Sequence, residues 1–134
     1  MSITWKPEYD LGIKEIDKQH EELIEIINHL NNSLHSLKSG EGIYEIFSEL
    51  ERFSNYHQKF EEDYFKKFNY EYAEEHIKEH RLFLEYLSNL KSDALIHNNL
   101  HLAFKLLDFL EDWLITHEQG SDKKYVECFK KNGL

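Results

Sequence analysis

The sequence has little of the residues that end helices or cross-link chains: one proline, five glycines and one cysteine in 134 residues. Pro7 lies near the N-terminus, so no long segment after it contains the strongest helix terminator. Cys128 has no second cysteine with which to form a disulfide, so nothing implies an oxidising compartment. A parallel sheet would need β-branched runs, yet Val126 is the only valine. These absences favour a helical protein.

Positive charge is also scarce, since 16 Lys and Arg face 26 Asp and Glu, for a net charge of -10. This charge would repel nucleic acids and anionic lipid surfaces, so neither is expected as a partner. The opening MSITWKPEYD does not resemble a signal peptide, and no apolar run approaches membrane-spanning length. We therefore expect a cytoplasmic monomer whose residues 1–134 form one domain.

Four stripes of apolar residues with three-and-four spacing predict helices at about 12–38, 42–67, 70–91 and 99–117. The 70–91 helix is expected to be the shortest, followed by a connection over 92–99. Asn69 is expected to cap the start of this helix, and Gly120 to break the chain before a short last segment that ends near Phe129. Short connections force antiparallel neighbours. The predicted fold class is all-α, an up-down-up-down four-helix bundle with an N-terminal arm and a short C-terminal helix.

Histidine, by contrast, occurs nine times. Five histidines and two carboxylates fall on the apolar stripes or next to them, and they come from all four helices: His20, His57, Glu61, His76, His80, His117 and Asp122. The pairs in this set are four residues apart, except that Asp122 follows His117 by five and aligns with it only after a break. The other histidines fall at polar-face or loop positions and are expected to be solvated: His29, His35, His97 and His101.

A single histidine on an apolar stripe is usually a hydrogen-bonded core residue. Five imidazoles and two carboxylates in one core could not satisfy one another without burying charge, whereas a metal cluster would balance them. No cysteine belongs to the set, so iron, manganese or zinc fits better than an iron–sulfur cluster. With two octahedral ions, two bridging carboxylates and one bridging oxygen, eleven of the twelve positions are filled. The vacancy falls on the ion with fewer histidines.

The order of these residues resembles the hemerythrin family, specifically its single-domain bacterial members, across nearly the whole chain. The family pattern is a lone histidine on the first helix followed by HxxxE, HxxxH and HxxxxD. It is met by His20, by His57 with Glu61, by His76 with His80, and by His117 with Asp122. Trp5, the stretch LGIKEIDKQH, Trp113-Leu114 and Tyr125 resemble the family as well.

The resemblance implies a cofactor of two non-haem iron ions. His76, His80 and His117 would hold one iron, His20 and His57 the other, and Glu61 and Asp122 would bridge them. Dioxygen would bind at the second iron, with Leu114 covering the open position and Leu23, Trp113, Gln58 and Tyr125 expected nearby. Gln58 departs from the family, which usually has phenylalanine after the histidine of the second helix.

Three functions are compatible with such a site. The leading interpretation is reversible dioxygen binding, without catalysis, for transport, storage or sensing. The alternative is a di-iron oxidase, peroxidase or nitric-oxide-consuming enzyme on the same scaffold. Five imidazoles and only two carboxylates supply little negative charge to stabilise high-valent iron, which favours binding. A structural bundle with adventitious zinc would leave the vacancy without a purpose.

Overall fold

The computed structural model describes residues 3–36, 43–97 and 100–134, and these residues form helices without any strand. A 3₁₀ turn, η1, precedes the bundle and a π-helix, η2, lies within its last arm. The elements are η1 (Pro7–Tyr9), α1 (Lys14–Ser36), α2 (Ile43–Lys67), α3 (Ala73–His97), α4 (Leu100–Trp113), η2 (Leu114–Ser121) and α5 (Asp122–Lys131).

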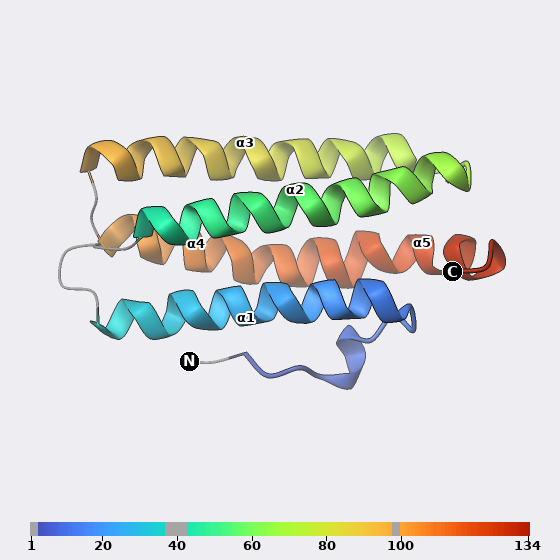
Figure 1. Ribbon diagram of the computed structural model, residues 1–134, viewed down its shortest axis with the longest axis horizontal. Coiled ribbons are helices and arrows are strands. Elements are labelled where there is room, and N and C mark those ends of the chain that lie inside the picture. Colours follow the sequence, from blue (N-terminus) through green and yellow to red (C-terminus); the bar gives the residue numbers. More distant parts are fainter. Residues whose placement is uncertain (1–2, 37–42, 98–99) are drawn as a thin grey trace.

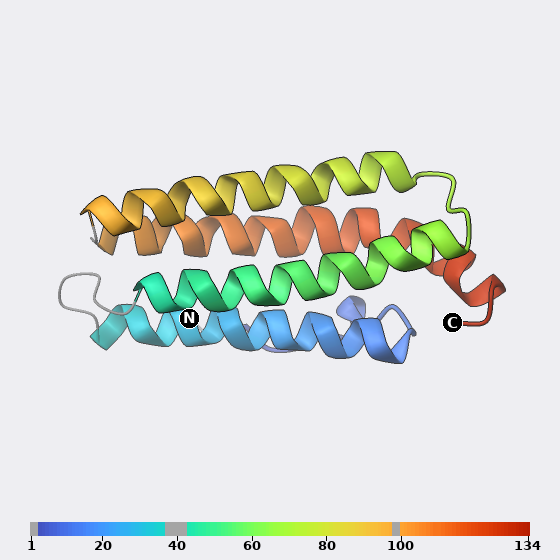
Figure 2. The ribbon, with the colours of Figure 1, turned by 45° about the horizontal axis from the view of Figure 1, so that its top comes forward.

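The four long arms run side by side and alternate in direction (Figures 1 and 2). α1 contacts α2 and α4, and α3 contacts the same two helices on the opposite side of the bundle. The fourth arm consists of α4, η2 and α5 in succession. This arrangement confirms the predicted all-α, up-down-up-down bundle, in which every helix buries one face against two neighbours.

The third helix differs from its predicted bounds. α3 begins at Ala73 and continues to His97, so it has 25 residues and is not the shortest helix. The prediction of a connection over 92–97 was wrong, because Leu90 and Ala94 are both buried and extend the apolar stripe by another turn. Tyr72, assigned to this stripe, lies before the helix and is 47% exposed. The predicted loop residues 37–42 and 98–99 lie outside the described residues.

Asn69 ends α2 instead of capping the start of α3. Its φ of 52° is in the left-handed region, which asparagine tolerates better than most residues. The Tyr70 N–H donates to the Phe65 carbonyl at 2.9 Å, and the Asn69 N–H donates to Lys66 at 3.4 Å. These two bonds, with the rings of Phe65 and Tyr70 packed at 5.0 Å, form a Schellman motif. The polar side chain was therefore correctly read as a boundary but assigned to the wrong helix.

No break occurs at Gly120, contrary to the prediction. The chain stays helical through η2, whose wider turns are closed by hydrogen bonds between residues five apart, as from the Asp122 N–H to the His117 carbonyl. In an α-helix, five residues rotate about 140° past a full turn, so His117 and Asp122 would diverge. The wider turns of a π-helix bring residues five apart closer to one face, and such helices are frequent at functional sites.

The continuity of η2 predicts that Gly120→Ala stabilises the protein. Nothing lies within 4 Å of a Cβ built at Gly120, so alanine fits and lowers the entropy of the unfolded chain. We expect a gain of about 0.5–1 kcal/mol, or about 2–4 °C in the thermal midpoint. Gly12→Ala is the matched control and should destabilise, because Gly12 has a φ of +75°. A lower midpoint for Gly120→Ala, measured by circular dichroism, would mean that the segment needs glycine.

The hydrophobic core consists of two clusters separated along the bundle. One contains Leu23 and Leu30 of α1, Phe47 of α2 and Leu87 of α3, together with the buried residues of α4. The other lies at the opposite end, toward the α2–α3 connection and α5. Its members are Leu11, Ile13, Ile16, Phe65, Tyr70, Tyr125 and Phe129. On each arm, the predicted metal ligands fall between the residues of the two clusters.

The N-terminal arm lies beside α1, where Ile3 and Asn28 exchange two hydrogen bonds of 2.6 and 2.8 Å.

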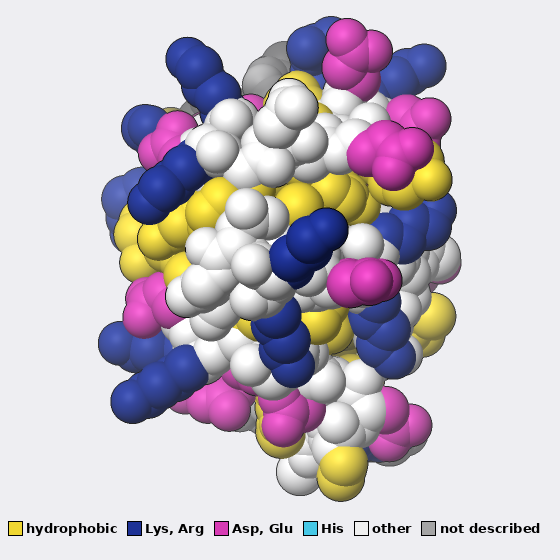
Figure 3. Space-filling model, turned by 90° about the vertical axis from the view of Figure 1, so that its right-hand side faces the viewer, with side chains coloured by type: hydrophobic (Ala, Val, Ile, Leu, Met, Phe, Trp, Pro, Cys, Tyr) yellow, Lys and Arg dark blue, Asp and Glu magenta, His cyan; other side chains and the backbone are white. Residues whose placement is uncertain are grey.

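The end of the bundle that carries α5 shows charged side chains of both signs around hydrophobic ones, and no histidine is visible there (Figure 3). None of the helices in the described part of the chain combines the length and apolar character that crossing a bilayer requires.

Candidate metal centre

All seven residues predicted as metal ligands converge in the layer between the two hydrophobic clusters. Each is at most 5% exposed: His20, His57, Glu61, His76, His80, His117 and Asp122. They form two groups whose ligand atoms lie within 4.8 Å of one another. One group contains Glu61, His76, His80 and His117, and the other contains His20, His57, Glu118 and Asp122. The structure therefore brings the predicted residues together and adds Glu118.

Glu61 faces both groups. Its Oε1 lies 3.0 Å from His80 Nε2 and 3.3 Å from His76 Nε2. Its Oε2 lies 3.5 Å from Nε2 of His57, which belongs to the other group. Burial would raise the pKa of Glu61, but its histidine neighbours lower it below its usual range, so the side chain is a carboxylate. A carboxylate with one oxygen toward each group has the orientation of a bridging ligand.

Asp122 has the same orientation from the opposite side. Its Oδ1 lies 2.9 Å from His76 Nε2 and 3.1 Å from His117 Nε2, and its Oδ2 lies 3.1 Å from His20 Nε2. Burial raises its pKa, but the neighbouring histidines hold it well below the ordinary value. Asp122 reaches this position only because η2 is a π-helix. The two carboxylates thus lie between the same two sets of imidazoles.

The buried polar atoms of the centre fit a metal better than they fit one another. Nε2 of every one of the five histidines is buried without a hydrogen-bond partner, as are Glu61 Oε1 and both oxygens of Asp122. A neutral imidazole that donates through Nδ1 presents a lone pair at Nε2, and a lone pair cannot pair with a carboxylate. Cations placed between Nε2 and the carboxylate oxygens would satisfy both.

The outer nitrogens of three histidines are held by side chains that the sequence analysis missed. His57 Nδ1 donates to Gln19 at 2.6 Å, His80 Nδ1 donates to Glu62 at 2.8 Å, and His117 Nδ1 lies 3.4 Å from Glu79. Each partner is the sequence neighbour of a predicted ligand on an adjacent arm, and this adjacency was the available signal. Such contacts fix the ring orientation and direct Nε2 inward. Ser121 in turn donates to both oxygens of Glu79, at 2.7 and 2.8 Å.

Burial and the neighbouring acids shift the pKa values of the buried histidines in opposite directions. Burial lowers the pKa of His20, but Glu118 and Asp122 outweigh burial and raise it to about 9. Burial likewise lowers the pKa of His117, and Asp122 outweighs it to raise the pKa to about 10. For His57 burial prevails and lowers the pKa to about 4. The neighbouring acids thus favour the protonated forms of His20 and His117, and a proton on a ligating nitrogen must leave when metal binds.

Tyr125 holds one bridging carboxylate from outside. Its hydroxyl donates to Glu61 Oε2 at 2.5 Å, and the side chain is fully buried. Burial raises the pKa of Tyr125 well above its ordinary value, and the neighbouring Asp122 and Glu61 raise it further. The phenol therefore stays protonated and acts as a fixed donor to Glu61. Tyr125 thus contacts a predicted ligand, and its expected place near dioxygen stays a prediction.

The other predicted pocket residues surround the centre unequally. The indole of Trp113 stacks on the His117 ring, with centroids 3.9 Å apart and an angle of 10°. Leu23 and Leu114 are buried and apolar, as a wall around a small uncharged ligand requires. Gln58 is buried too, at 4% exposure, and its amide oxygen has no hydrogen-bond partner. Its predicted place in a dioxygen pocket stays a prediction.

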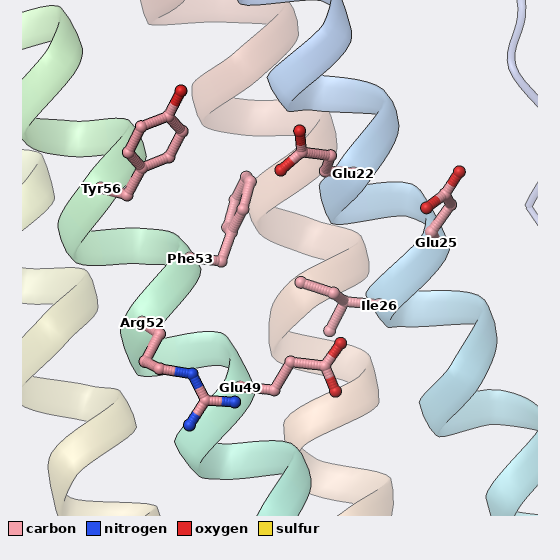
Figure 4. A pocket seen from close by; sticks show the side chains of 7 residues that line it. All are labelled: Glu22, Glu25, Ile26, Glu49, Arg52, Phe53 and Tyr56. Carbon is pink, nitrogen blue, oxygen red and sulfur yellow. The ribbon is translucent and has the colours of Figure 1, made fainter.

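A surface pocket between α1 and α2 lies beside the centre (Figure 4). Its lining residues are Glu22, Glu25, Ile26, Glu49, Arg52, Phe53 and Tyr56. The Phe53 ring stacks on His57 with centroids 5.5 Å apart, and the Tyr56 hydroxyl accepts a long 3.4 Å hydrogen bond from Gln19. Phe53 therefore lies between the pocket and one of the predicted ligands.

Glu118 is the buried acid that sequence reasoning did not predict. Its side chain is 3% exposed, and burial raises its pKa to about 8. Glu118 follows the buried Leu114 by four residues and precedes Asp122 by four, a spacing that puts all three on one face of an α-helix. This spacing was the signal available in the sequence, and it was passed over in favour of the neighbouring His117.

The remaining histidines agree with their assignment wherever the structure describes them. His101 is exposed, and the 59% exposed side chain of His29 lies 3.6 Å from Glu49. The side chains of His35 and His97 lie outside the described residues.

Comparison with known proteins identifies the family. The model of the "Hemerythrin HHE cation binding domain" matches residues 11–129. A bacteriohemerythrin of Clostridium acetobutylicum is 29% identical over 93% of this chain and 99% of its own. A hemerythrin-like protein of Naegleria gruberi is 31% identical over 92% of this chain and 90% of its own. The crystal structure of a hemerythrin mutant superposes with a TM-score of 0.83 at 22% identity, covering 96% of this chain and 98% of that one. Because the family match spans most of the sequence, the chain belongs to the hemerythrin family.

Proposed function

We propose that this protein binds dioxygen reversibly at a pair of non-haem iron ions held by the seven convergent residues. The observation that carries the proposal is the orientation of Glu61 and Asp122, each of which directs its two oxygens toward different groups of imidazoles. Bacteriohemerythrin is also the name of several of its relatives. When bound, the irons would supply the binding position and the electrons that dioxygen accepts. In this proposal the protein binds dioxygen and does not catalyse a reaction with it.

The ligands divide between the two irons by proximity. His76, His80 and His117 would hold one iron, and His20 and His57 the other, with both carboxylates shared. Five imidazoles and two bridging carboxylates leave the second iron the more open, so we place dioxygen there. The buried apolar residues Leu23 and Leu114 would exclude water from this position.

The surrounding residues hold the ligands and their protons in place. Gln19, Glu62 and Glu79 accept or lie near the Nδ1 protons, which keeps the Nε2 lone pairs directed at the irons. Tyr125 stays protonated, and its hydroxyl donates a hydrogen bond to Glu61, which limits the rotation of that carboxylate. The protein thus provides a rigid, water-poor site before any ligand arrives.

Metal content is the first test. We expect about two irons per chain after expression in iron-replete medium, because the donor set suits two octahedral ions. Elemental analysis together with protein quantification measures this ratio. A single metal, or chiefly zinc, would contradict the proposal.

A second candidate function is a di-iron oxidase, peroxidase or nitric-oxide-consuming enzyme. Glu118 favours it, because a third buried carboxylate makes the site more like the carboxylate-rich di-iron centres of four-helix bundles. Absorption spectra of the reduced protein before exposure to air, after exposure and after removal of oxygen separate the two candidates. Return to the colourless form indicates a binder, and irreversible oxidation with substrate turnover indicates an enzyme.

A further inference from the structure

Glu118 is a buried carboxyl group without a hydrogen-bond partner. The side chain is 3% exposed, and both of its oxygens are buried without a hydrogen-bond partner. Leaving a carboxyl group in this state costs free energy that a nearby cation would offset. His20 Nδ1 lies 3.8 Å from Glu118 Oε2, beyond hydrogen-bond distance.

Glu118 faces the group of donors that contains His20 and His57. Glu118 lies in the π-helix between His117 and Asp122, both predicted ligands. Its ligand atom falls within 4.8 Å of those of His20, His57 and Asp122, a group of four buried donors. The same group is the one to which the iron with fewer histidines was assigned.

We propose that Glu118 is a third carboxylate ligand, bound to the iron held by His20 and His57. The inference rests on the proposed di-iron centre. With two octahedral ions, the seven predicted ligands and one bridging oxygen fill eleven of twelve positions, and Glu118 is the twelfth donor. The carboxylate is then an internal competitor for the position at which dioxygen or a small anion binds.

A different role for Glu118 would be to hold His20 from outside. Gln19, Glu62 and Glu79 do this for histidines on adjacent arms, and Glu118 would complete that series. Their distances to the histidine Nδ1 atoms are 2.6, 2.8 and 3.4 Å, whereas that of Glu118 is 3.8 Å. Each of the other three carries at least one hydrogen bond, and Glu118 carries none. The geometry therefore favours ligation over this outer contact.

Azide binding to the oxidised, iron-loaded protein tests the proposal. The proteins compared are wild type, Glu118→Gln, Glu118→Asp and Glu127→Gln, the last an exposed glutamate on α5 that controls for net charge. Iron content is measured first, and azide is then titrated while its charge-transfer absorption is followed. We expect azide to bind wild type and Glu127→Gln at least about tenfold more weakly than both Glu118 variants, because a tethered carboxylate competes at high effective concentration.

The aspartate variant separates ligation from charge repulsion. Aspartate keeps the negative charge but is one methylene shorter, so it should free the position as glutamine does. Weak azide binding by both wild type and Glu118→Asp, with tight binding only by Glu118→Gln, would overturn ligation in favour of repulsion. Equal affinity in all four proteins would overturn it as well. Wild type with fewer than about two irons would instead contradict the di-iron centre itself.

The crystal structure of the iron-loaded wild type tests, independently of any variant, whether Glu118 ligates the iron. A Glu118 oxygen at about 2.0–2.2 Å from the iron supports ligation, the range found for carboxylate–metal bonds. A Glu118 carboxylate that bonds only His20 Nδ1 would overturn it.

Discussion

Removal of iron is expected to lower the thermal unfolding midpoint by more than about 10 °C, equivalent to about 3–4 kcal/mol for a chain of this length. The apoprotein keeps five imidazoles and three carboxyl groups in one buried layer, and none of the five Nε2 atoms has a hydrogen-bond partner. Protonation of His20 and His117 offsets part of this cost, since their pKa values rise to about 9 and about 10. The apoprotein should therefore remain helical but loosened.

Calorimetry of loaded, iron-free and reconstituted protein at one pH measures the effect. Reconstitution is the control, because it must restore the original midpoint if chelation has caused no damage. Equal midpoints for the loaded and iron-free proteins would show that the centre contributes little to folding, contrary to the burial of its ligands.

Replacement of Glu61 by alanine is expected to reduce the iron content from about two to about one or fewer per chain, because a bridging ligand serves both ions. Gln58→Ala is the matched control, since Gln58 is also buried on α2, three residues away, and is predicted to ligate neither iron. Both variants lose a buried polar side chain of similar size. A difference in iron content therefore reports ligation and not a cavity in the core.

Reconstitution under identical conditions followed by elemental analysis gives the two ratios. A Glu61→Ala protein that still holds two irons would refute the bridging role. The hydroxyl of Tyr125 loses its acceptor in the same variant, so some loss of stability is expected as well.

The fold was predictable because its determinants are local. The apolar stripes of α1 and α2 follow from the spacing of residues such as Ile16, Leu23 and Phe53, and the structure places α2 at Ile43–Lys67, within a residue of its predicted start. His20, His57, His76 and His80 were found because each lies on such a stripe, so an α-helix alone turns it inward. Four inward histidines from three helices already required a common partner.

Only the tertiary structure decided how the last arm is wound. The histidine and aspartate of HxxxxD do not align on an α-helix. Either a break at Gly120 or a π-helix would align the two side chains. The choice depends on packing, since Leu114, His117 and Asp122 are all buried against the other arms and together hold the wider turns. Glu118 is buried on the same arm, four residues after Leu114 and four before Asp122.

The sequence by itself therefore determined the bundle, its antiparallel order and seven polar residues of one core, because each depends on spacing within a single helix. The tertiary structure decided which atoms face one another. It brought Gln19, Glu62 and Glu79 to histidines on adjacent arms, and it showed the two oxygens of each shared carboxylate directed at different groups. These relations join residues far apart in the chain, so they depend on how the helices pack and not on the period of any one of them.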